Sequence, residues 1–178
     1  MTLLGAVLRP EPFAVRVDGD LYAYRAMPAL PWLAAITDDL WITAVFPGLL
    51  CDDAYRQHAL DGIQHGTLPM AAVNRACFDA IGQAGGRKWW ETFNLCAIAR
   101  ADSSGALLGR MVAAGVDPER VTLAGWCSAL YSLLCEGADP KTRMRIDAAV
   151  TTPPPIAEAF DDAADDSFAA MVAAARMA

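Results

Sequence analysis

The sequence predicts a mainly α-helical protein with a small N-terminal β-hairpin, a compact multi-helix domain and an acidic C-terminal tail. Three observations favour this class. Apolar side chains recur at helical spacing through most of the chain, as in residues 88–100 and 123–136. β-prone residues gather in one short stretch, residues 13–25, around an Asp-Gly turn. Beyond Pro155 almost every charged residue is acidic.

We expect three parts along the chain. Residues 1–152 form a helical domain with its hairpin at 13–25, residues 153–155 form a proline spacer, and residues 156–178 form an acidic amphipathic tail. A triple proline is stiff and extended, so it separates the tail from the domain. The tail has five acids and one base, a charge of −4 within the net −7 of the chain. Such an alanine-rich segment is marginal as an isolated helix, so we expect it to be dispensable for the fold and to order best against a partner.

The hairpin is predicted from two β-prone runs, residues 13–17 and 21–25, on either side of Asp18-Gly19-Asp20. A lone hairpin is marginally stable in water. It therefore has to pack on the helices or pair with another chain, and its outer edges can accept a partner strand.

We expect four helices between the hairpin and the Gly85-Gly86 break, over residues 31–36, 40–45, 53–64 and 69–84. Aspartates stand at two of the expected starts, where a carboxylate can accept a hydrogen bond from a free backbone N–H. These aspartates are Asp38, Asp39 and Asp52. The expected inward residues are Tyr55, Ala59, Leu60 and Ile63 on the third helix and Met70, Val73, Cys77, Ile81 and Ala84 on the fourth.

Residues 85–137 hold three of the five tryptophans and are the expected core. Residues 88–100 are apolar over most of a helical circumference, which is typical of a helix with neighbours on several sides. Thr122 is the expected N-cap of the next strong helix, and Gly137 its stop. A shorter helix over 104–114 lies between them, and a last helix follows Asp139-Pro140. We expect one contiguous core that contains Trp89, Phe93, Trp126 and Leu130.

Composition restricts the function classes. No apolar run reaches the roughly 18–20 residues of a membrane span, so no membrane partner is expected. A net charge of −7 argues against a nucleic-acid surface, which needs clustered Lys and Arg. Five cysteines form no CxxC pair and fit reduced, mostly buried thiols in a cytosolic protein.

Candidate chemistry is sparse. Cys51 and His58 lie close to several aspartates, so a nucleophilic site is conceivable. His58 falls on the polar face of its helix, however, and nothing nearby supplies an oxyanion hole. His65 is expected at a helix end. Neither a zinc pattern, a calcium loop nor a phosphate-binding loop is present, so we expect no metal, no cofactor and no enzymatic activity.

Several features in fixed order carry a resemblance to a known family. They are the N-terminal hairpin, Pro28 to Leu33 (PALPWL), Gly86-Arg87-Lys88-Trp89-Trp90, Gly115-Val116-Asp117-Pro118, residues 123–131 (LAGWCSALY) and the closing Thr-Thr-Pro-Pro. Together these features, over about residues 13–155, resemble the tail assembly chaperones of long-tailed phages that infect actinobacteria. Order and spacing carry the resemblance, since none of the motifs is specific alone.

The resemblance implies a non-enzymatic protein of the host cytoplasm. Such a protein coats the tape measure protein and helps the major tail protein polymerise around it. The family offers no catalytic residues to carry over. Its genes often yield a short product and a frameshifted longer one, and this chain would fit the short product. A homo-oligomer is compatible with this role.

Two other functions remain open on the sequence. One is a virion structural component, either a head-tail connector or a tail subunit. The other is a small cytosolic enzyme that uses Cys51 and His58. For the favoured chaperone, the expected partner contacts are on the hairpin and the tail. The residues are Phe13, Val15, Val17, Leu21, Tyr22, Tyr24, Phe160 and Phe168.

Overall fold

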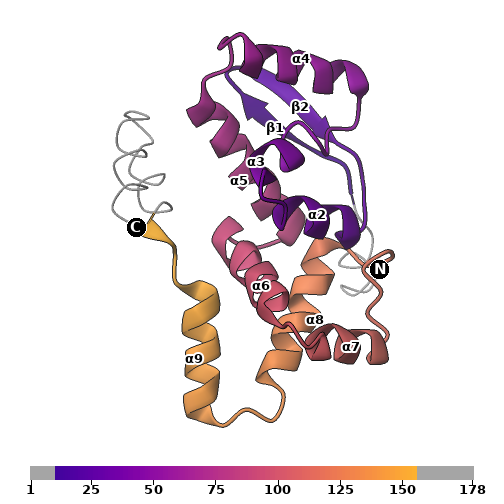
Figure 1. Cartoon of the computed structure of the whole chain (residues 1–178), viewed down its shortest axis with the longest axis vertical. Helices are drawn as coiled ribbons and strands as arrows, with labels where there is room; N and C mark the ends of the chain where they lie inside the picture. Colours follow the sequence, from indigo (N-terminus) through magenta and orange to yellow (C-terminus); the bar gives the residue numbers. More distant parts are fainter. Residues whose placement is uncertain (1–10, 156–178) are drawn as a thin grey trace.

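A computed structural model describes residues 11–155, and Figure 1 shows its course. An antiparallel two-stranded hairpin comes first, and eight helices follow within these residues, which confirms the mainly helical class. The strands are β1 (Phe13–Val17) and β2 (Asp20–Tyr24). The helices are α2 (Ala29–Ile36), α3 (Trp41–Val45), α4 (Asp53–Gln64), α5 (Met70–Gly85), α6 (Trp89–Ala101), α7 (Ala106–Ala113), α8 (Leu123–Cys135) and α9 (Pro140–Thr151).

The hairpin forms where the sequence predicts it, with β2 beginning one residue earlier than expected. Asp18 and Gly19 make the two-residue turn, with φ values of 49° and 97°. Positive φ at both central residues is what a tight hairpin turn needs, and the Asp-Gly pair supplies it. One face of the hairpin is buried, and α5 packs against β1. The hairpin is therefore part of the core.

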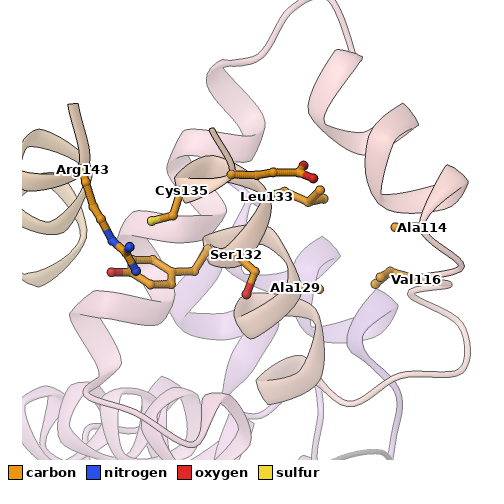
Figure 2. Close-up of a pocket in the computed structure, with 9 residues that line it drawn as sticks. Ala114, Val116, Ala129, Ser132, Leu133, Cys135 and Arg143 are labelled. Atoms are coloured by element: carbon orange, nitrogen blue, oxygen red, sulfur yellow. The ribbon is translucent and has the colours of Figure 1, made fainter. Parts of the chain in front are cut away.

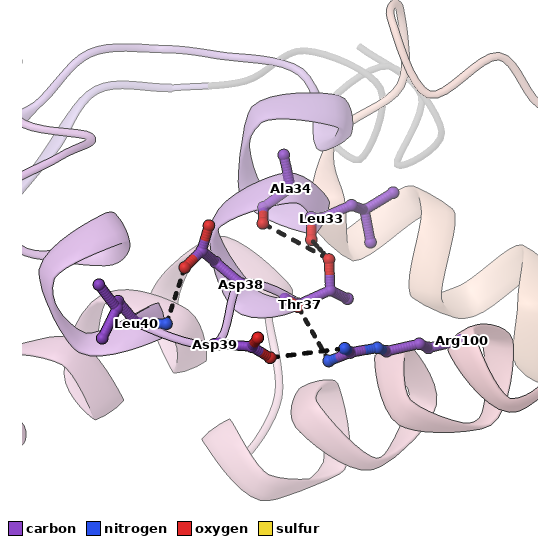
Figure 3. Close-up of polar contacts among 7 residues, drawn as sticks. All are labelled: Leu33, Ala34, Thr37, Asp38, Asp39, Leu40 and Arg100. Atoms are coloured by element: carbon purple, nitrogen blue, oxygen red, sulfur yellow. Dashed lines mark hydrogen bonds and ion pairs between the residues drawn. The ribbon is translucent and has the colours of Figure 1, made fainter.

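A polar network fixes the α2–α3 turn against α6 (Figure 3). The Arg100 guanidinium donates to the Thr37 carbonyl at 2.9 Å and lies 3.6 Å from the Asp39 carboxylate. The Leu40 N–H donates to Asp38 at 2.7 Å. Neither aspartate is the N-cap of α3, whose N-cap is Leu40 without a side-chain bond. Asp38 and Asp39 instead hold the turn between α2 and α3. Trp41, which follows this turn, lies beside α5 and α6.

α4 begins as predicted, with the Asp52 carboxylate accepting from the Ala54 N–H. Its inward face differs from the expectation, because Tyr55 and Leu60 are 44% and 40% exposed. The buried positions are small, Ala59 and Gly62. A Cβ on Gly62 would lie 2.7 Å from Leu68 Cγ, so Leu68, in the segment between α4 and α5, packs directly against the helix there. Of the four predicted inward residues, Ala59 is buried and Ile63 is half-buried against the core, while Tyr55 and Leu60 face outward.

α5 is the most buried helix. The core is therefore centred on α5, which precedes most of the 85–137 block where the sequence predicts it. α5 buries eight residues, against four on α6. The absence of a side chain at Gly85 lets α6 approach α5 closely, since a Cβ there would lie 2.1 Å from Thr92 Oγ1. Gly86 then ends α5 in the left-handed conformation, as the Gly-Gly break predicts. α6 packs against α5, α9, α8 and α2, so its expected several-sided packing is confirmed.

The later helices follow the predicted signals. The Thr122 hydroxyl accepts from the Gly125 N–H at 3.0 Å and caps α8. Gly137 adopts a positive φ just after α8, and Asp139 caps α9 with Pro140 in its first turn. α9 ends against α6, where Trp90 Nε1 donates to the Thr151 carbonyl at 3.2 Å. The chain thus returns to the first turn of α6 before the prolines.

One apolar core runs from the hairpin to α9. Trp126 and Leu130 lie within it, and Trp89 and Phe93 are half-buried against it, so the predicted contiguous core is confirmed with the latter two at its margin. No helix within residues 11–155 is both long and apolar enough to cross a bilayer. The predicted tail, residues 156–178, lies outside the described residues.

Candidate interaction surfaces

The hairpin residues predicted to contact a partner divide by face. Val15, Val17, Tyr22 and Tyr24 are at most 2% exposed, so their side chains belong to the core. Phe13 is half-buried in a stack with Tyr24 and Trp32. Leu21 is 55% exposed on the outward face. Phe160 and Phe168 lie outside the described residues.

The register explains this division, because side chains alternate across the two faces of a strand. Val15 lies opposite Tyr22, and both point inward. The outward face carries Ala14, Arg16, Leu21 and Ala23. Alternation is readable from the sequence, but both faces of this hairpin hold apolar residues. Only packing on the helices decides which one is buried.

The two edges of the hairpin also differ. The Cys51 N–H donates to the Ala23 carbonyl at 2.9 Å, and Tyr24 pairs with Leu50, so β2 is partly covered by the chain itself. β1 makes backbone hydrogen bonds only to β2 among the described residues. An unpaired strand edge is a template for a further strand. Among residues 11–155, the strand edge without a backbone partner is therefore that of β1.

A row of aromatic rings crosses α3, α5 and α6. Successive ring centroids lie 5.5 Å apart from Trp41 to Phe78, 3.9 Å from Phe78 to Trp89 and 5.8 Å from Trp89 to Trp90. Phe93 joins it at 5.7 Å from Trp41. We call these five residues the aromatic row. Trp41, Trp89 and Phe93 keep part of their surface exposed.

Apolar surface continues beyond Trp41. Leu40 is 73% exposed and Met70 38% exposed. With Trp41 and Ile42 they line a hollow of about 240 Å³. The sequence does not reveal this surface, because its rings come from three helices that only tertiary packing brings together. The one local hint is the Trp89 and Phe93 spacing on α6.

A second, larger hollow of about 550 Å³ follows the outer side of α8. Figure 2 shows Arg143 reaching from α9 on the side of Cys135, while Ala114 and Val116 lie on the other side. At its rim Arg110 forms a 2.7 Å salt bridge with Glu136. The residues that line it are Ala114, Val116, Ala129, Tyr131, Ser132, Leu133, Cys135, Glu136 and Arg143.

Tyr131 ties this hollow to α9. Its hydroxyl donates a short hydrogen bond to the Asp147 carboxylate. That bond raises the pKa of Tyr131 to about 12, so the phenol is protonated at neutral pH. A protonated phenol engaged with a carboxylate is not available as a base. The contact therefore joins α8 to α9 and has a structural role.

The structure adds no support to a nucleophilic site at Cys51 and His58. Cys51 and His58 are both exposed, and the His58 ring stacks on Tyr22 at 6.3 Å. His65 caps the end of α4, where its Nδ1 lies 2.8 Å from the Asp61 carbonyl oxygen, as predicted.

The expected buried thiols are confirmed for Cys77, Cys96 and Cys127, and Cys135 is half-buried. Burial raises the pKa of Cys77 to about 12. Hydrogen bonding to Cys127, together with burial, raises the pKa of Cys96 well above its usual value. Among the described residues, no group of three or more His, Cys, Asp or Glu is placed to hold a metal ion.

Comparison with known protein families, with curated proteins and with solved structures finds no match to this chain.

Proposed function

We propose that this protein is a non-enzymatic phage tail assembly chaperone that binds the tape measure protein and promotes tail tube assembly in the host cytoplasm. The proposal rests on the ordered sequence features over about residues 13–155 that resemble this family. The single structural observation in its favour is the hairpin edge. β1 is unpaired on one side among the described residues, next to an outward face that carries exposed Leu21.

The structure changes which hairpin groups we assign to the contact. The inward side chains are committed to the core, so a partner meets the backbone of β1 and the outward face. Strand addition draws its affinity from main-chain hydrogen bonds and its specificity from side chains on alternate positions. Many weak contacts of this kind along one long partner give avidity while each remains displaceable as tube subunits arrive.

Co-expression with the long helical product of the adjacent gene tests the proposal. Size-exclusion chromatography with light scattering should show one complex that holds several copies of this chain. Leu21→Glu should weaken the complex, because it places a charge on the outward hairpin face. Leu108→Glu is the matched control, since Leu108 is 52% exposed on α7. A partner that stays soluble alone and forms no complex at micromolar concentration would remove the proposal.

The virion structural component is the alternative. Mass spectrometry of purified virions separates the two, because a chaperone should be absent from the particle and a connector or tail subunit present in it. The Cys51 and His58 enzyme is tested by the Cys51→Ala/His58→Ala double variant. Unchanged support of tail assembly by that variant dismisses it.

A further inference from the structure

We propose that the aromatic row is the docking site of the chain's own residues 156–178, which bind it through Phe160 and Phe168. This inference does not depend on the identity of the partner in tail assembly. It rests on the apolar surface itself, on where the described chain ends, and on the pattern of the sequence that follows.

The row has the composition of a binding surface. Tryptophan, phenylalanine and methionine are enriched where proteins bind one another. Trp41, Trp89 and Phe93 are partly exposed, and the hollow formed with Leu40 and Met70 lies at one end of the row. Phe78 and Trp90 are buried, at 5% and 8% exposed, so the accessible apolar surface is that of Trp41, Trp89, Phe93 and the hollow. Exposed apolar surface of this kind marks an interaction site.

The chain leaves the described structure at the other end of the row. Trp90 Nε1 donates to the Thr151 carbonyl at 3.2 Å, and Asn94 Nδ2 donates to the Thr152 carbonyl at 3.2 Å. α9 therefore brings its C-terminal end to the first turns of α6 (Figure 1), where it contacts Trp90. Three prolines then separate this anchor from residue 156.

The following sequence matches the row in chemistry. Phe160, Ala164, Phe168 and Met171 share one stripe at helical spacing. As a helix, the twelve residues from Phe160 to Met171, with eleven rises between them, would span about 17 Å.

Charge favours the same pairing. The segment carries Glu158 and four aspartates. Lys88 lies over the Trp90 ring at 4.7 Å, and exposed Arg75 lies one turn before Phe78 on α5. Lys88 forms no salt bridge with a carboxylate of residues 11–155, whereas Arg75 interacts electrostatically with Asp79 one turn along α5. A short tether also gives the attached segment a high effective concentration at this surface, so modest affinity is enough.

NMR of the full chain tests the proposal through its five tryptophan indole signals. In Phe160→Ser/Phe168→Ser, the Trp41 and Trp89 signals should shift and exchange faster with water. The Trp32 and Trp126 signals, from side chains 2% exposed, should stay in place. Ala169→Ser/Ala173→Ser is the control, because it changes the opposite side of the same segment and keeps its charge. Unchanged Trp41 and Trp89 signals in the phenylalanine variant would overturn the proposal.

A second variant tests the receiving surface. Leu40→Glu/Met70→Glu changes two exposed side chains, so the fold should survive, and the added charges should repel the acidic segment. It should produce the same Trp89 shift as the phenylalanine variant. If it leaves Trp89 unchanged, the segment binds elsewhere and the assignment fails. The shifts should also be independent of protein concentration; dependence on concentration would assign the site to the tail of a second copy instead.

Discussion

Trp126 is a buried core side chain whose indole N–H lacks a hydrogen-bond partner among the described residues. It is 2% exposed, in the centre of the core. Its contribution is therefore apolar packing. An N–H group buried without a partner costs free energy relative to a fully satisfied site.

Trp126→Ala should lower the free energy of unfolding by roughly 3–5 kcal/mol, because a large side chain is removed from a packed interior. Trp126→Phe should cost clearly less, since it keeps an aromatic ring and removes the unpaired N–H. Urea denaturation measures both. Leu108→Ala, on the exposed side of α7, is the control and should change stability by no more than about 0.5 kcal/mol. A Trp126→Ala protein of near wild-type stability would contradict the packing.

The rate at which each cysteine reacts with a thiol reagent should depend on how deeply it is buried. Cys51 is exposed and should react with a thiol reagent in the native protein, whereas Cys77, Cys96 and Cys127 should react only after unfolding. The reason is both access and ionisation, because the thiolate is the reactive form and burial raises the pKa of Cys77 to about 12. Cys51→Ser should remove the Cys51 share of the fast phase, which leaves the half-buried Cys135 as the one partly accessible thiol among residues 11–155. A fast phase that persists in this variant and maps to Cys77 would show that the core opens.

At the scale of elements, α8 and α9 are joined by the Tyr131 to Asp147 hydrogen bond. The bond raises the pKa of Tyr131 from 10.0 to about 12 in the folded protein. A raised pKa means that the folded state holds the proton more tightly. The bond therefore stabilises the fold fully below pH 10, and this contribution is lost as the pH rises from 10 to about 12.

Wild type should therefore lose more stability than Tyr131→Phe between pH 10 and 12, because the phenylalanine has no proton to lose. Urea midpoints at pH values on either side of 10 measure the difference. Burial also raises the pKa of Tyr22 and Tyr24, but these residues are the same in both proteins. Identical pH dependence in the two proteins would show that the bond does not join the helices in solution.

The N-cap of α8 gives a second test at this scale. The Thr122 hydroxyl accepts from the Gly125 N–H, which is one of the otherwise unbonded donors at the helix start. Thr122→Ala should cost about 1 kcal/mol, and Thr122→Ser, which keeps the oxygen, should cost less. Thermal or urea unfolding of both variants measures the loss. Equal destabilisation by alanine and serine would assign the effect to the lost methyl group instead.

For the whole molecule, one apolar cluster includes residues from β1 and β2 through to α9. A shared core predicts a single cooperative transition. Val15→Ala in the hairpin and Leu130→Ala in α8 should each shift the same transition when it is followed by circular dichroism and by tryptophan fluorescence. Two separated transitions in either variant would mean that the hairpin and the helices unfold as independent units.

The sequence by itself determined the local features. Asp18-Gly19 fixed the hairpin turn, Asp52, Thr122 and Asp139 fixed helix starts, and Gly86 and Gly137 marked helix ends. Each acts through its own side chain or its own φ, within a few residues, so spacing alone reveals it. The helical stripe of α8 was predictable for the same reason, since helical periodicity places its residues on one side.

Only the tertiary structure decided which of several apolar faces became interior. The hairpin has apolar residues on both faces, and packing on α5 buried Val15 and Tyr22 while leaving Leu21 outside. On α4 the small residues Ala59 and Gly62 are buried while Tyr55 and Leu60 face outward, and Leu68 of the following segment packs against Gly62. The aromatic row joins residues of three helices, and no sequence period links them. Burial depends on which surfaces meet, and that is a property of the assembled helices.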